Sequence, residues 1–437
     1  MINVEIWEWF LAPLYILVSV PFIWKLSNSN TRKYLITGVA ARIVGAFSFF
    51  LIYVFYYNGG DTVAYYTTAV SITNLFSEDF TKALEVLFSG FSEERYSYFS
   101  STTGFPHAYI MQDPSTFMVS KIIVPILLIS MKSYLLATLL IAQLSIIGPW
   151  YLFKFLRTIT NGNSRIAAIS VLLFPSVLFW GCGISKDTIT YSSLCFLIYT
   201  IHQILSKNSV NFFTATFASI SAYFILIIKP YIFIAVVPSL LLWVFSSRIK
   251  KIRNKFIRIS ITPATILLSI LLFSYVFVAI SPYLGDYSVD KIIDKALITQ
   301  EDLTRDVYGE NSFNIGTIEP TFFGILSKFP IATFYGFFGP TLLHVNNIVM
   351  LFSALENTFL LLLTMRIFVF RNPMNTFQRI EASPFLTFCF TFAILLGFSI
   401  GLSTPNFGAL VRFKIPMIPF FVFMLLSISY KIDLKEK

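Results

Sequence analysis

The chain has 437 residues, of which 56% are apolar and 12% are charged, whereas soluble domains have roughly 45–50% apolar and about 25% charged residues. A mean hydropathy of +0.75 leaves too little polar surface to cover soluble domains of this length, so a soluble globular enzyme is excluded and a membrane protein is predicted. The net charge of +10 does not require nucleic acid, because membrane proteins concentrate basic residues in their cytoplasmic loops.

Apolar runs long enough to cross a bilayer, which needs ~20 residues, predict an all-α, polytopic helix bundle. The chain is expected to form a single transmembrane domain, residues 1–437, with about eleven transmembrane helices. The predicted helices cover residues 6–24, 34–57, 134–155, 166–183, 187–205, 210–228, 231–247, 260–280, 345–365, 383–401 and 412–430.

Basic loops follow the first, third, seventh and ninth of these helices. They lie on one side of the membrane if the N-terminus is outside and the C-terminus is inside, which is the orientation that the positive-inside rule favours. This assignment requires that the apolar runs 117–131 and 321–338 do not cross. Both are short or interrupted, by Lys121 in the first and by Lys328 and Pro330 in the second. Residues 58–133 are therefore predicted as an outer loop with interfacial helices, and residues 281–344 as a second outer loop with a re-entrant or interfacial helix.

Ionisable residues near the membrane are costly, so each is a functional candidate. Asp61 follows Gly59 and Gly60 at the end of the second predicted helix, where two glycines permit a sharp turn. The carboxylate is a candidate catalytic group at the mouth of a helix bundle. The alternative is that Asp61 caps the next helix.

Four cations lie at predicted outer turns, where the positive-inside rule disfavours them. Lys186 follows Gly183 and precedes Asp187 at a tight turn, and Lys229 marks another turn; Arg412 and Lys414 open the last predicted helix. Together they are candidates for holding a phosphate or pyrophosphate. The alternative is that they anchor the helices to lipid phosphates at the interface.

Other polar residues are predicted to line the same cavity or to pair inside the bundle. Glu356 lies in the middle of a predicted helix and needs a partner at that depth, for which Arg42 is the candidate in a structural buried pair. The three cysteines match no disulfide framework or metal-ligand spacing, and no metal or cofactor is expected. The candidate cavity-lining residues are Tyr65, Tyr66, His107, Asp113, Asp187, His344 and Asn406.

Four short motifs carry a family resemblance. They are Gly60-Asp61 with Tyr65-Tyr66, Pro175-Ser176 leading to Gly183-Ile184-Ser185-Lys186-Asp187, Ile228-Lys229-Pro230-Tyr231, and Asn406-Phe407-Gly408 leading to Arg412-Phe413-Lys414. With the long outer loop, they make the chain resemble the multi-spanning C-type glycosyltransferases, including the bacterial repeat-unit polymerases of O-antigen, capsule and exopolysaccharide.

The resemblance implies a multi-pass protein of the bacterial cytoplasmic membrane that moves a sugar from a polyprenyl phosphate or pyrophosphate donor to a glycan or glycolipid acceptor at the outer face. Asp61 would be the catalytic carboxylate, and the cations would hold the phosphate. Membrane lipids and other envelope-assembly proteins are the expected partners, with no nucleic acid. The alternatives are a transporter or flippase of lipid-linked oligosaccharide and a noncatalytic envelope-assembly scaffold.

Overall fold

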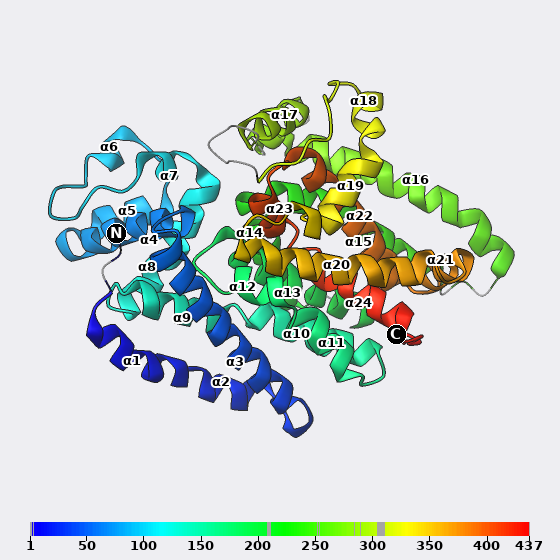
Figure 1. Ribbon diagram of the computed structural model, residues 1–437, viewed down its shortest axis with the longest axis horizontal. Helices are drawn as coiled ribbons and strands as arrows, with labels where there is room; N and C mark the ends of the chain where they lie inside the picture. Colours follow the sequence, from blue (N-terminus) through cyan, green and yellow to red (C-terminus); the bar gives the residue numbers. More distant parts are fainter. Residues whose placement is uncertain are drawn as a thin grey trace. The chain divides into compact units, whose positions relative to one another are not determined.

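The computed structural model describes residue 2 and residues 4–207, 211–250, 252, 254–283, 285–288, 290–303 and 311–436. These residues form helices joined by loops (Figure 1), and no β-strand is assigned among them. An isolated antiparallel bridge pairs Ser312 with Asn406. The prediction of an all-α fold is confirmed.

The chain divides into two compact units, which are described separately. Unit 1 contains Met1–Phe153, Val171–Ile201 and Phe212–Lys229, and unit 2 contains Lys154–Ser170, His202–Asn211 and Pro230–Lys437. The chain passes between the units more than once, so neither is a continuous stretch of sequence.

The first part of the chain, up to Ile228, is built from fourteen helices and a π-helical turn in the described residues. They are α1 (Ile6–Leu17), α2 (Ser19–Leu26), α3 (Ser29–Leu51), the π-helical turn (Ile52–Tyr56), α4 (Asp61–Glu78), α5 (Phe80–Phe88), α6 (Glu93–Tyr96), α7 (Ala108–Gln112), α8 (Pro114–Ile129), α9 (Tyr134–Leu144), α10 (Ile147–Ile159), α11 (Ser164–Val171), α12 (Pro175–Trp180), α13 (Lys186–Lys207) and α14 (Phe212–Ile228).

The remaining helices all belong to unit 2. They are α15 (Pro230–Ile249), α16 (Lys255–Ile280), α17 (Ile292–Leu303), α18 (Phe322–Ser327), α19 (Phe329–Phe338), α20 (Ile348–Phe368), α21 (Pro373–Ala382), α22 (Pro384–Ser403), α23 (Phe407–Phe413) and α24 (Ile418–Ser429), with 3₁₀ turns at Ser281–Tyr283, Gly285–Tyr287 and Leu342–His344.

Eight helices within the described residues are long and apolar enough to cross a membrane, and a bent pair could make a ninth. This is the pattern of a multi-pass membrane protein. The bent pair is α23 with α24, whose axes differ by 70°. The eight helices are Ile6–Leu26, Ser29–Tyr56, Tyr134–Ile159, Lys186–Ser206, Pro230–Ile249, Pro263–Ile280, Ile348–Phe368 and Pro384–Ser403.

The predicted spans over 166–183 and 412–430 are not continuous helices, because both runs are broken. The first divides into α11 and α12, with Pro175 as the first residue of α12. The second divides at Lys414–Met417, which contains Pro416, and Pro419 is the second residue of α24. Proline has no N–H for the helix ladder and clashes with the preceding turn, so it ends or bends a helix. The run 210–228 forms α14, a 17-residue apolar helix.

The runs 117–131 and 321–338, predicted not to cross, form short helices. The first lies in the 16-residue α8, and the second is divided between α18 and the 10-residue α19. None of these reaches the length of a straight span.

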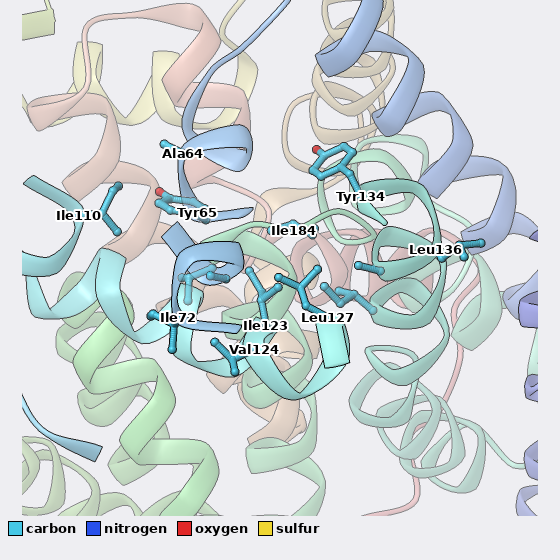
Figure 2. Close-up of a cluster of buried hydrophobic side chains, with 14 of the residues drawn as sticks. Ala64, Tyr65, Ile72, Ile110, Ile123, Val124, Leu127, Tyr134, Leu136 and Ile184 are labelled. Carbon is cyan, nitrogen blue, oxygen red and sulfur yellow. The ribbon is translucent and has the colours of Figure 1, made fainter. Parts of the chain in front are cut away.

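The core of unit 1 is formed by α3, α4, α8, α9 and α12. Helix α3 packs against α9 and α12, and α4 packs against α8. Figure 2 shows the apolar side chains that α4, α8 and α9 bring together, among them Tyr65, Ile123, Leu127 and Tyr134. In unit 2, α22 packs against α15, α19 and α24. A Cβ on Gly401 would lie 1.8 Å from the Ala332 carbonyl oxygen, so α22 and α19 meet backbone to backbone.

Candidate functional site

Asp61 is the first residue of α4, directly after a sharp turn. Asn58 and Gly60 have φ values of 50° and 102°, and a Cβ on Gly60 would lie 3.1 Å from the ring of Tyr53. A left-handed φ together with this contact explains why glycine occupies position 60. The predicted turn is confirmed, and it leaves Asp61 exposed at the start of α4.

Lys186 pairs with Asp113, which is the N-cap of α8. Its ammonium lies 3.5 Å from Asp113 Oδ2 and donates to Ser115 Oγ at 2.8 Å. Asp113 also accepts hydrogen bonds from Ser115 and from the Thr116 hydroxyl. Burial acts to raise the pKa of the Asp113 carboxyl, but Lys186 and these hydrogen bonds together outweigh it and lower the pKa. The Lys186 side chain keeps 19% of its surface exposed.

Lys229 forms an ion pair with Asp187 in which both side chains are buried. The ammonium donates to Asp187 Oδ1, and the two side chains are 4% and 0% exposed. Asp187 follows Lys186 in the sequence, but consecutive residues on a helix point in different directions. Asp187 therefore balances the charge of Lys229, and Asp113 that of Lys186.

These residues form one group inside unit 1, the α13 charge cluster, defined as Asp61, Asp113, Lys186, Asp187 and Lys229. Lys186 connects its members, because its ammonium interacts electrostatically with Asp113, Lys229 and Asp61. The cluster holds three carboxylates and two cations, a balance of −1. Of the two cations, Lys186 is the more exposed.

An apolar cavity of about 210 Å³ lies along the first turns of α13. It is lined by Gly183, Ile184 and Ser185, which directly precede Lys186, and by Thr188 and Ile189 in the first turns of α13. Its remaining walls come from α8, α9 and Phe224 of α14. Unit 1 thus presents a charged cluster and an apolar cavity at the same end of α13.

Arg42 is buried in α3, with 1% of its surface exposed. Its Nη1 donates to Ser145 Oγ at 2.6 Å and to the Gly181 carbonyl at 2.8 Å. Its predicted partner Glu356 belongs to unit 2, where it interacts electrostatically with Lys414. Each member of the predicted pair thus has contacts inside its own unit.

The remaining candidates of unit 1 have local contacts. Tyr65 is buried in the core (Figure 2), and its carbonyl accepts from Ser120 Oγ. The Tyr66 hydroxyl donates to the Lys132 carbonyl at 2.6 Å, and burial with the nearby Glu8 raises its pKa to about 12, so it stays protonated at neutral pH. His107 is exposed, and its ring lies 5.5 Å from that of Tyr109.

The candidate cations of unit 2 lie at the bend between α23 and α24. Lys414 is 1% exposed and donates to the Asn357 side-chain oxygen and to the Gly339 carbonyl, the latter at 3.0 Å. Asn357 in turn donates to the Pro340 carbonyl at 2.9 Å. These contacts connect the bend to α20 and to the end of α19. Arg412 is half-buried in α23.

His344 and Asn406 have structural contacts near this bend. Asn406 caps α23 by accepting from the Ala409 N–H at 3.1 Å. His344 bonds the Thr341 hydroxyl at 2.8 Å, and its ring centroid lies 4.7 Å from that of Phe407. Both residues stabilise the local fold of unit 2.

Sequence analysis missed the hydroxyl groups that complete the charge cluster. Ser115 contacts both Lys186 and Asp113, and Thr116 contacts Asp113. The local signal is Asp113-Pro114, an N-cap followed by proline at the first helical position. It predicts the start of α8 but not the contact with Lys186, which is 71 residues away from Ser115.

Among the described residues, no three His, Cys, Asp or Glu side chains come together as a metal site. Comparison of the chain with protein-family models, with curated proteins and with solved structures finds no match.

Proposed function

We propose that the chain is a membrane glycosyltransferase that uses a polyprenyl phosphate or pyrophosphate sugar donor, acting at the outer face of the membrane in the assembly of cell-surface glycans. The observation that supports it is the α13 charge cluster beside the apolar cavity. A lipid-linked sugar combines an anionic group with a long apolar chain; the partly exposed Lys186 offers a cation for the first, and the cavity offers an apolar surface for the second.

Asp61 is the proposed general base. It accepts the proton of an acceptor hydroxyl while that oxygen forms a bond to the anomeric carbon. The bond from the anomeric carbon to the phosphate oxygen breaks, and the phosphate leaves with the electron pair. A single displacement of this kind inverts the anomeric centre. Asp61 suits the role because it is exposed and interacts electrostatically with Lys186.

Lys186 is the proposed contact of the departing phosphate. A leaving group that is already a phosphate needs its charge stabilised more than it needs a proton. Lys186 is partly exposed, and its Asp113 partner lies at 3.5 Å, longer than the ~2.7–2.9 Å of a tight charge-assisted hydrogen bond. The buried Lys229–Asp187 pair is assigned a positioning role. The predicted phosphate-binding role of Arg412 and Lys414 stays a prediction.

The proposed topology has eleven crossings, with the N-terminus outside and the C-terminus inside. It is made of the eight long apolar helices, the bent pair, α14 and the broken run of α11 with α12. This orientation places the basic loops on the cytoplasmic side of a bacterial inner membrane. It also places the start of α4, which carries Asp61, on the outer side.

The test is turnover by the purified full chain in phosphatidylcholine nanodiscs, where no ion or potential gradient exists. With a polyprenyl-linked sugar and an acceptor glycan, the proposal predicts glycan product. Lys186→Gln should lower kcat/KM by roughly 10- to 100-fold, the effect of losing a hydrogen bond to a charged group.

The matched control is Lys82→Gln, which removes an exposed lysine paired with Asp79 elsewhere in unit 1 and should leave turnover unchanged. A transporter predicts movement of the lipid-linked sugar across a bilayer with no new glycosidic bond, and a scaffold predicts neither. Either of these results, or equal activity in Lys186→Gln and Lys82→Gln, contradicts the proposal.

A further inference from the structure

A polar cavity lies in unit 2, and no member of the α13 charge cluster lines it. It has a volume of about 240 Å³. One wall is aromatic, formed by Phe155, His202 and Trp243, and the ring of Phe155 stacks on that of His202 with centroids 4.0 Å apart. The charged groups of the lining are Arg248, Lys250 and Glu436.

The Glu436 carboxylate occupies the part of this cavity next to the N-terminus of α22. It accepts hydrogen bonds from the Ser383 hydroxyl and from the Phe385 N–H, the latter at 3.0 and 3.2 Å from its two oxygens. Lys250 interacts with it electrostatically. A carboxylate from the chain itself therefore rests among donors that suit an external anion.

The segment that carries Glu436 is a short tail after α24. The Lys435 N–H donates to the carbonyl of Ile159, the last residue of α10, at 2.8 Å. The side chain of Asn161, just after α10, donates to the Asp433 carbonyl at 3.2 Å. Asp433 and Lys435 are exposed. A tail attached by contacts of this kind can leave its place locally without unfolding the helices.

Once the segment that carries Glu436 leaves the cavity, the remaining charges of the cavity favour binding of an anion. Arg248 and Lys250 then remain with the α22 N-terminus and without the carboxylate that offsets them. Basic pockets between transmembrane helices on the cytoplasmic side are known to take anionic lipid head groups. Arg248 and Lys250 begin the most basic of the loops predicted to be cytoplasmic.

We propose that this cavity is a binding site for a phosphate-bearing anion, and that Glu436 is a built-in competitor for it. The phosphate lies between Arg248, Lys250 and the first residues of α22. The ligand is either the head group of an anionic lipid or a free phosphate, since both present the same charge and the same acceptor oxygens. The site is independent of the proposed transfer reaction.

The experiment measures the thermal unfolding midpoint of the purified full chain in two series. The first uses phosphatidylcholine nanodiscs titrated with inorganic phosphate. The second compares phosphatidylcholine nanodiscs with nanodiscs of equimolar phosphatidylcholine and phosphatidic acid. Stabilisation in the first series identifies free phosphate as a ligand, and stabilisation in the second alone identifies the lipid head group. Stabilisation in neither series overturns the proposal.

Three variants test where the anion binds. Lys250→Gln should lower the affinity for the stabilising ligand by about tenfold, which corresponds to the lower end of the free energy that a hydrogen bond to a charged group contributes. Glu436→Gln should raise the affinity for the same ligand, because the competing negative charge is gone. Without ligand, the same variant should have a lower thermal unfolding midpoint than the wild type. Lys82→Gln serves as the charge-matched control and should match the wild type. If Lys250→Gln binds as the wild type does, or if Glu436→Gln weakens binding, the proposal is overturned.

Discussion

Lys229 and Asp187 form a buried ion pair in which each residue neutralises the charge of the other. With side chains 4% and 0% exposed, neither charge can be solvated if the other is removed. Removing one member of a buried pair typically costs ~3–5 kcal/mol, whereas replacing both by apolar residues is often neutral. The pair is therefore a structural support whose loss acts through an uncompensated charge.

We expect Lys229→Met to lower the free energy of unfolding by about 3–5 kcal/mol and the double variant with Asp187→Leu to recover most of the loss. Denaturation of the purified protein in mixed micelles measures both. Lys82→Met is the control, since it breaks the exposed pair with Asp79 and should cost less than about 1 kcal/mol. A double variant as unstable as the single one would show that the charges do not balance each other.

Residue types and turns of the candidate site were predictable, but the pairings within it were not. Asp61 after two glycines and lysines at outer turns are visible in the sequence. The partners are not, because Asp113 reaches Lys186 and Asp187 reaches Lys229 only through the packing of α8, α13 and α14. Asp187, which follows Lys186 in the sequence, is the partner of Lys229 instead.

At the scale of elements, the start of α5 depends on the Asp79 cap. Its carboxylate accepts from the Thr81 hydroxyl and from the backbone N–H groups of Thr81 and Lys82. The hydrogen bond from the Thr81 hydroxyl is the largest cause that lowers the pKa of Asp79, followed by the Lys82 N–H, and the pKa falls to about 2 from 3.8. A folded-state pKa below the unfolded one means that the cap stabilises α5 above pH 3.8 and is lost as the pH falls toward 2.

Asp79→Ala should therefore speed amide hydrogen exchange in α5 at pH 7, with the difference from the wild type shrinking as the pH falls through this window. Exchange followed by mass spectrometry, corrected for the intrinsic pH dependence, measures it. Asp286→Ala, at an exposed ion pair in unit 2, is the control and should leave α5 unchanged. A difference that stays constant from neutral pH to pH 2 contradicts the assignment of the cap.

Close approach of α10 to α13 explains glycine at position 148. A Cβ there would lie 1.9 Å from the Ser192 carbonyl oxygen, whereas one on Gly90 would meet nothing within 4 Å. Gly148→Ala should destabilise unit 1 by about 1–3 kcal/mol through overpacking, although alanine is the better helix former by about 1 kcal/mol. Thermal unfolding compares it with Gly90→Ala, which should be close to the wild type. If Gly148→Ala were more stable than the wild type, the close approach of α10 to α13 at this position would be contradicted.

The helices themselves were predicted well where an apolar run is uninterrupted, since hydropathy and length decide a span. The two breaks were missed although the sequence carries their cause. Pro175 interrupts the run 166–183, and Pro416 and Pro419 lie inside the run 412–430. The bend at Lys414 also depends on Asn357 and the Gly339 carbonyl, which lie far away in the sequence and could not be anticipated.

At the scale of the whole molecule, the proposed orientation can be tested with cysteines, because all three natural ones are buried. We expect Glu93→Cys, in the predicted outer loop, to react in intact cells with a membrane-impermeant maleimide. Lys435→Cys, in the tail, should react only after the cells are permeabilised. Both positions are exposed, so labelling of both or of Lys435→Cys alone in intact cells would contradict the orientation.

Asp61 is the residue on which the proposed sugar transfer most depends. The most direct measurement is the rate of sugar transfer from a polyprenyl-linked donor by purified Asp61→Asn protein, compared with the wild type and with Asp79→Asn at equal amounts of folded protein. Loss of a general base should lower the rate by ~10²–10⁴-fold, whereas Asp79→Asn should transfer sugar at the wild-type rate. Wild-type transfer by Asp61→Asn would contradict the catalytic role of Asp61 and the mechanism built on it.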